Sequence, residues 1–196
     1  MKKALGNIAD ISTGATLREK PSEATAWERD ALLMQLGDLD TVGNIQTHTM
    51  LPVELQTQFD KFVVRMGDIV FRGRGAGIVA AAMPETTLPV IVASPLIIIR
   101  PDIRKVDPDY LVWALTADHA RRFYAEHSRG SSIVGIGKRD LDLLEIDLPS
   151  LDTQKKIAQL KKLEVEEQHL LTRYQKAKAR LVEAMIIDTL HKEKAA

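Results

Sequence analysis

A glycine-rich run that follows an apolar segment has the composition of a phosphate-binding loop. It reads Arg72-Gly73-Arg74-Gly75-Ala76-Gly77 and comes directly after Val70-Phe71. Glycine lets a backbone approach a phosphate closely, and arginine supplies a matching charge. The dinucleotide fingerprint needs a third glycine where Ile78 stands, so this run is not a loop of that kind.

Other catalytic and metal-binding patterns also fail. Gly137-Lys138 is similar to the end of a Walker loop, but Arg139 stands where that loop needs Ser or Thr. The five histidines lack the ligand spacing of a zinc site, and the sequence contains no cysteine. We therefore predict that the chain is not an enzyme and binds no metal or cofactor. An enzyme with an unrecognised site remains a third alternative with little support.

Composition and charge suggest one globular domain with an appendage. The chain has 196 residues, of which 45% are hydrophobic and 28% charged. The absence of cysteine is typical of the reducing cytoplasm, and no signal peptide is recognised. Net charge is zero, but residues 65–139 carry 11 basic and 7 acidic groups. That segment can face phosphates, or it can be an ordinary solvated surface.

Residues 1–149 alternate short apolar runs with Gly, Pro and Asp, a pattern that predicts a mixed α/β (α+β) domain with irregular loops. Asp107-Pro108 predicts the start of a helix, because Asp caps free N–H groups and Pro suits the first helical position. A second helix is expected near Asp118. Strands are predicted at 31–36, 63–71 (strand, turn, strand), 78–82, 90–92 and 96–99.

Residues 150–196 contain no Gly and no Pro and predict one long helix from Leu151 to His191, with Ser150 as its N-cap. Such a helix is roughly 60 Å long, longer than a 150-residue domain is wide. It therefore needs a helical partner; the alternative, a helix folded back on its own domain, would favour a monomer in solution. A coiled-coil seam, interrupted by Glu167, follows a 3-4 spacing through Leu160, Leu163, Leu170, Tyr174, Ala177, Leu181 and Ala184.

Several short motifs together resemble the specificity subunit of type I restriction–modification systems. The resemblance is to one half of that subunit, a target-recognition domain (1–149) followed by a spacer helix (150–196). The most specific motif is Gln154-Lys155-Lys156-Ile157-Ala158, at the start of the long helix. The other motifs lie at 5–14, 67–71, 94–101, 108–111, 130–132 and 144–151.

The resemblance implies that the domain reads part of a bipartite site on double-stranded DNA. It also implies that the helix sets the distance to a second recognition domain and docks methyltransferase (M) subunits, with the restriction (R) subunit as a further partner. Full-length members carry two domains and two helices, whereas this sequence has one of each. We therefore expect a homodimer that forms through the helix and reads an inverted-repeat DNA site. We expect the protein to work in the cytoplasm and not to bind a membrane. A fragment of a longer chain remains an open alternative.

Basic and polar loop residues are the candidates for DNA contact, because Arg and Lys bind phosphate and guanine. The resemblance does not transfer these residues, since recognition loops vary within the family. A second class of function is also open: a coiled-coil adaptor whose globular domain binds a protein. The predicted DNA-binding residues are Arg18, Lys20, Gln46, Thr47, His48, Arg72, Arg74, Arg129, Ser131, Ser132 and Lys138.

Overall fold

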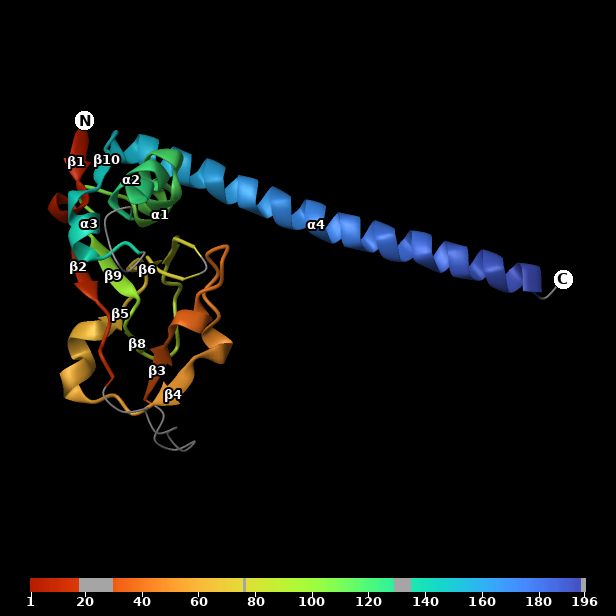
Figure 1. Ribbon diagram of the computed structural model, residues 1–196, viewed down its shortest axis with the longest axis horizontal. Coiled ribbons are helices and arrows are strands. Elements are labelled where there is room, and N and C mark those ends of the chain that lie inside the picture. Colours follow the sequence, from red (N-terminus) through yellow and green to blue (C-terminus); the bar gives the residue numbers. More distant parts are fainter. Residues whose placement is uncertain (18–29, 76, 129–134, 195–196) are drawn as a thin grey trace. The chain divides into compact units, whose positions relative to one another are not determined.

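The computed structural model of the chain describes residues 1–17, 30–75, 77–128 and 135–194, and side chains as far as Ile187. Contacts divide the chain into two compact units, Met1–Lys155 (unit 1) and Lys156–Ala196 (unit 2). Unit 1 is a mixed α/β domain, and the chain ends in a long helix (Figure 1), which confirms the predicted fold class.

The first sheet of unit 1 is antiparallel and has the order β2-β9-β6-β7. Ile11 lies opposite Ile99, and Val70 lies opposite Ile98. All of β6 is buried, as expected for an apolar run covered on both faces. The strands are β2 (Ala9–Thr13), β9 (Ile97–Pro101), β6 (Ile69–Arg72) and β7 (Val79–Ala82).

The second sheet has the order β4-β3-β8-β5, with a parallel pair between β3 and β8. Its strands are β4 (Leu51–Val53), β3 (Ala31–Met34), β8 (Val90–Val92) and β5 (Val63–Val64). The two sheets share a core, and its buried residues include Met34, Val70, Val90, Val92 and Ile98. Another cluster, built on Leu33 and Ile91, packs against the 3-10 helix η4 (Thr57–Phe62).

Two helices follow the first sheet: α1 (Pro108–Thr116) and α2 (Asp118–Ser128). The Asp107 carboxylate accepts a hydrogen bond from the Tyr110 N–H at 3.0 Å, so α1 begins where the sequence predicts. The Tyr124 hydroxyl of α2 donates to the Leu115 carbonyl at 3.0 Å. The Tyr124 and Phe71 ring centroids lie 5.9 Å apart, which joins α2 to the first sheet.

The first strand of the chain pairs with the last strand of unit 1. Strand β1 (Lys2–Ala4) pairs antiparallel with β10 (Glu145–Asp147), and the Leu148 N–H donates to the Met1 carbonyl at 2.8 Å. Helix α3 (Lys138–Leu143) precedes β10 and packs against the 3-10 helix η1 (Leu5–Asn7). These short elements were not predicted from sequence, because segments of three to six residues leave no periodic signal.

Helix α4 (Leu151–Lys194) is 44 residues long and ends near the predicted position. Its first turn is capped by Ser150, whose hydroxyl accepts a hydrogen bond from the Thr153 N–H at 3.3 Å. Within the described ranges, none of the helices has the length and apolar content needed to cross a membrane. The predicted strands correspond to β3, β5 with β6, β7, β8 and β9. Unit 1 also contains the 3-10 helices η2 (Leu36–Asp38) and η3 (Thr47–Thr49).

Candidate nucleic-acid interface

Arg72, the last residue of β6, is buried at 6% exposure. Its Nη1 donates to the Leu39 carbonyl at 2.7 Å, and its Nε donates to the Gly77 carbonyl at 3.3 Å. Its Nη2 is buried without a hydrogen-bond partner in the part of the chain that the structure describes. The sequence places Arg72 among the predicted DNA-binding residues, a role for which an exposed side chain is expected. The burial of Arg72 corrects that expectation: the guanidinium braces two loops from inside.

Arg74 differs from Arg72, because its side chain is exposed. Gly75 and Gly77 beside it have φ values of +84° and +125°, a region that favours glycine. Among described atoms, no heavy atom lies within 4 Å of where a Cβ would stand on either glycine. The Gly77 N–H donates to the Gly75 carbonyl at 2.8 Å, so these two glycines serve the tight turn beside Arg74.

The glycine-rich loop packs against the segment that precedes α3. The Ile136 N–H donates to the Gly73 carbonyl at 2.9 Å, and a Cβ on Gly73 would collide with the Ile136 carbonyl oxygen. Gly137 then caps α3, its N–H donating to the Asp140 carboxylate at 2.8 Å. Lys138, the first residue of α3, is exposed. The segment that carries the predicted Arg72 and Arg74 and the segment that carries the predicted Lys138 are thus neighbours in the fold.

The loop 36–50, which contains the predicted Gln46, Thr47 and His48, joins these two segments through the Arg72–Leu39 bond. Its buried Asp38 accepts hydrogen bonds from the Gln35 N–H at 2.7 Å and the Thr49 hydroxyl at 2.6 Å. The Gln46 N–H donates to the Asp38 carbonyl at 2.8 Å, which places η3. The side chains of Thr47 and His48 are exposed, whereas that of Gln46 is half-buried.

Asp40 closes the tip of the same loop. Its carboxylate accepts from the backbone N–H groups of Val42 at 2.9 Å and Asn44 at 2.8 Å, and from the Asn44 amide at 2.8 Å. Burial acts to raise the pKa of Asp40, but the hydrogen bonds from Asn44, Val42 and Gly43 outweigh it and hold that pKa below its ordinary value. The loop tip is therefore pre-shaped by a charged carboxylate at neutral pH.

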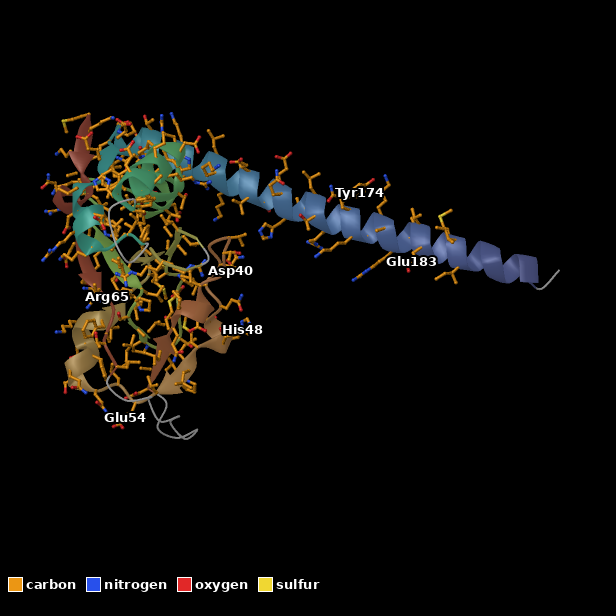
Figure 2. The ribbon with its side chains drawn as sticks, viewed as in Figure 1. Asp40, His48, Glu54, Arg65, Tyr174 and Glu183 are labelled. Carbon is orange, nitrogen blue, oxygen red and sulfur yellow. The ribbon has the colours of Figure 1, made fainter. Side chains whose placement is uncertain are left out.

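Figure 2 shows Asp40 and His48 on one side of unit 1, away from Arg65 and Glu54. We call the loop 36–50 together with residues 72–75, 77 and 135–138 the recognition surface. Its exposed side chains include the predicted Thr47, His48, Arg74 and Lys138. The predicted Arg18, Lys20, Arg129, Ser131 and Ser132 lie outside the described residues.

Sequence reasoning missed two kinds of residue. Asp38 and Asp40 are not among the residues predicted from the sequence, yet they shape the loop 36–50. The Asp-Leu-Asp spacing before Gly43-Asn44 is the sequence signal for this role. Gln154 was noted for its motif and given no role, but it is fully buried. In the described part of the chain, no group of three His, Cys, Asp or Glu side chains could hold a metal ion.

Solved structures of specificity subunits share this fold. The HsdS subunit from Thermoanaerobacter tengcongensis is 21% identical, with a TM-score of 0.58 over 89% of this chain and 39% of its own. A chain from a structure that describes complex assembly and conformational transition of the type I R-M system is 22% identical. Its TM-score is 0.62, and the match covers 89% of this chain and 40% of that chain. The type I restriction–modification S subunit from M. genitalium is 14% identical, with a TM-score of 0.52 over 88% and 42%.

This chain thus spans about 40% of the length of these solved relatives. No curated protein sequence matches it. Residues 1–167, which include all of unit 1, match the model of the type I restriction modification DNA specificity domain. The chain therefore belongs to the type I restriction–modification DNA specificity domain family.

Proposed function

We propose that this chain is the DNA-recognition subunit of a type I restriction–modification complex and has no catalytic activity of its own. Residues 1–149 form the recognition domain, and residues 150–196 form the spacer and dimerisation helix. The observation that carries the proposal is the match of residues 1–167 to the DNA specificity domain. That match does not favour the alternative of a protein-binding adaptor.

We assign contact with double-stranded DNA to the recognition surface. Arg74 and Lys138 are exposed cations on adjoining segments, and such side chains bind phosphate groups. Thr47 and His48 are exposed on a loop whose shape is held by Asp38. Such a loop loses little entropy when it binds, which favours base-edge contacts over a loop that must first be ordered.

We assign homodimer formation to the seam of α4. Leu160 is 66% exposed, Tyr174 is 65% exposed and Leu181 is 61% exposed, although all three are large apolar side chains. Each such residue, once buried, stabilises an interface by about 1.5–3 kcal/mol. A second copy with the same seam is a self-complementary partner, and two identical halves around a two-fold axis suit an inverted-repeat site.

A second apolar stripe on α4 is the proposed docking face for methyltransferase subunits, which in turn recruit the restriction subunit. Leu171 and Val182 each follow a seam residue by one position, so they are turned from the seam by about 100°. They and Ile186 are 46–55% exposed, and Val182 and Ile186 line a shallow hollow with Ala179. Methyl transfer belongs to those subunits, so this chain needs no cofactor and works in the cytoplasm with the genomic DNA.

The decisive experiment expresses the full chain with its methyltransferase subunits and sequences the methylated bases of the host genome. A palindromic bipartite motif with a fixed spacer supports DNA recognition by a dimer of identical halves. An asymmetric motif overturns the homodimer, because it requires a different second half. Methylation that is identical with and without this chain overturns the DNA-recognition role. The methyltransferase subunits expressed alone are the control.

A further inference from the structure

Gln154 occupies an unusual position at the start of α4. It lies in the first turn of the helix, yet its side chain has 0% exposure. Its Nε2 donates to the carbonyl of Lys105 at 3.2 Å and to the carbonyl of Pro149 at 3.0 Å. Its Oε1 accepts from the Asp107 N–H at 2.9 Å. Both amide protons and the amide oxygen are therefore engaged with backbone groups.

These three bonds join segments that are far apart in the sequence. Lys105 and Asp107 lie in the turn before α1, whereas Pro149 lies between β10 and α4. Asp107 also caps α1 through the Tyr110 N–H, and the Tyr110 hydroxyl donates to the Asp147 carbonyl at 2.6 Å. The first turn of α4, the start of α1 and the end of β10 thus meet at one buried amide.

Glutamine side chains are seldom fully buried, because an amide without hydrogen-bond partners in an apolar site costs free energy. An apolar side chain would have packed the first turn without that risk. What the amide adds is direction, since hydrogen bonds fix distance and angle where apolar contacts allow sliding. The three bonds therefore fix the first turn of α4, which is part of unit 1, against the start of α1 and the end of β10.

A small change at this turn is amplified along the helix. α4 is continuous for 44 residues, and a tilt of about 5° over roughly 60 Å moves the far end by about 5 Å. One base-pair step of DNA is roughly 3.4 Å. If the first turn of α4 could tilt by this much, the DNA spacer lengths that the complex accepts would vary by more than one base pair.

We infer that Gln154 is a positioning residue that locks the first turn of α4 to the start of α1 and the end of β10, and thereby sets the spacer length that the complex accepts. The first half of this inference concerns the chain alone. The second half rests on the proposed function, because a spacer exists only if two recognition domains read one DNA site.

The first test measures distances within the chain. Because the sequence contains no cysteine, Met66→Cys on unit 1 and Lys162→Cys on α4 place two spin labels at exposed positions. Excess unlabelled protein removes distances between copies, and double electron–electron resonance gives the distance distribution. With Gln154 present we expect a narrow distribution, and with Gln154→Met a roughly twofold broader one.

The choice of variants separates the hydrogen bonds from packing. Gln154→Met keeps the length and volume of the side chain and removes all three bonds, so it is expected to fold where Gln154→Ala could fail. Ser150→Ala is the matched control, because it removes the cap of the same turn and leaves the Gln154 bonds in place. A distribution that stays narrow in folded Gln154→Met, or broadens equally in Ser150→Ala, overturns the inference.

The second test uses the complex with methyltransferase subunits and DNA sites whose spacer is one base pair longer or shorter. We expect the unsubstituted complex to methylate one spacer length, and Gln154→Met to methylate neighbouring lengths with a selectivity roughly tenfold lower. Unchanged selectivity in Gln154→Met overturns the link to spacing. Failure of the unsubstituted complex to methylate any site tells against the proposed function, and the distance measurement still decides the role of Gln154.

Discussion

The Nη1 of Arg72 donates a hydrogen bond to the carbonyl of Leu39 at 2.7 Å, across 33 positions of sequence. This bond joins the end of β6 to the loop 36–50. The same guanidinium holds Gly77 through its Nε. Arg72 is therefore the link between two parts of the recognition surface, while Arg74, two residues away, is exposed.

Replacement of Arg72 is expected to act on stability. Arg72→Ala leaves the carbonyls of Leu39 and Gly77 without their donor, which costs about 1–3 kcal/mol in the free energy of unfolding. Thermal unfolding measures the loss, and amide exchange should quicken in the loop 36–50 before it quickens in the sheets. Unchanged stability and unchanged exchange in that loop would show that the brace contributes nothing.

Replacement of Arg74 is expected to act on DNA binding alone. Arg74→Ala removes an exposed cation, so the midpoint of unfolding should stay the same while affinity falls. If Arg74 contacts a phosphate, the slope of log K against log salt should shrink by about one. Arg65→Ala, an exposed arginine on a different side of unit 1 (Figure 2), is the control and should leave the slope unchanged.

If Arg72→Ala and Arg74→Ala combined leave both the affinity and its salt slope intact, the DNA contact lies elsewhere on unit 1. The measurement is a binding titration at several salt concentrations. The complex with methyltransferase subunits is used, because these partners are expected to supply part of the grip on DNA.

The seam of α4 can be tested with a matched pair of substitutions. Leu163 lies on the seam and is 55% exposed, whereas Val165 lies off it and is 53% exposed. Leu163→Glu should weaken the dimer by about tenfold or more, because it removes apolar burial and places a charge in the interface. Val165→Glu should leave the association unchanged. Sedimentation equilibrium measures both, and equal effects would argue against the seam.

The length of α4 is expected to act as a ruler. Deletion of residues 167–173 removes one heptad, so the seam keeps its register while the helix shortens by about 10 Å, or about three base-pair steps. The methylated motif should then have a shorter spacer, or methylation should be lost. A spacer that keeps its length in the shortened protein would reject the ruler and leave the dimer unaffected.

Local sequence determined the elements that need no distant partner. The absence of Gly and Pro after Pro149, with Ser150 ahead of a 3-4 apolar spacing, was enough to predict α4. Asp107-Pro108 was enough to place the start of α1, since a cap is a contact within one turn. The apolar runs at 90–92 and 96–99 were enough to predict strands, and β8 and β9 lie at these positions.

Tertiary structure decided which polar side chains are buried and which loops meet. From the sequence, an arginine in a glycine-rich run is expected to be exposed. In the structure Arg72 is buried, and its Nη1 donates to the Leu39 carbonyl. Gln154 looks like any polar residue of a helix until Lys105, Asp107 and Pro149 surround its amide. Such roles depend on hydrogen bonds across many positions of the chain, and neither residue type nor spacing encodes them.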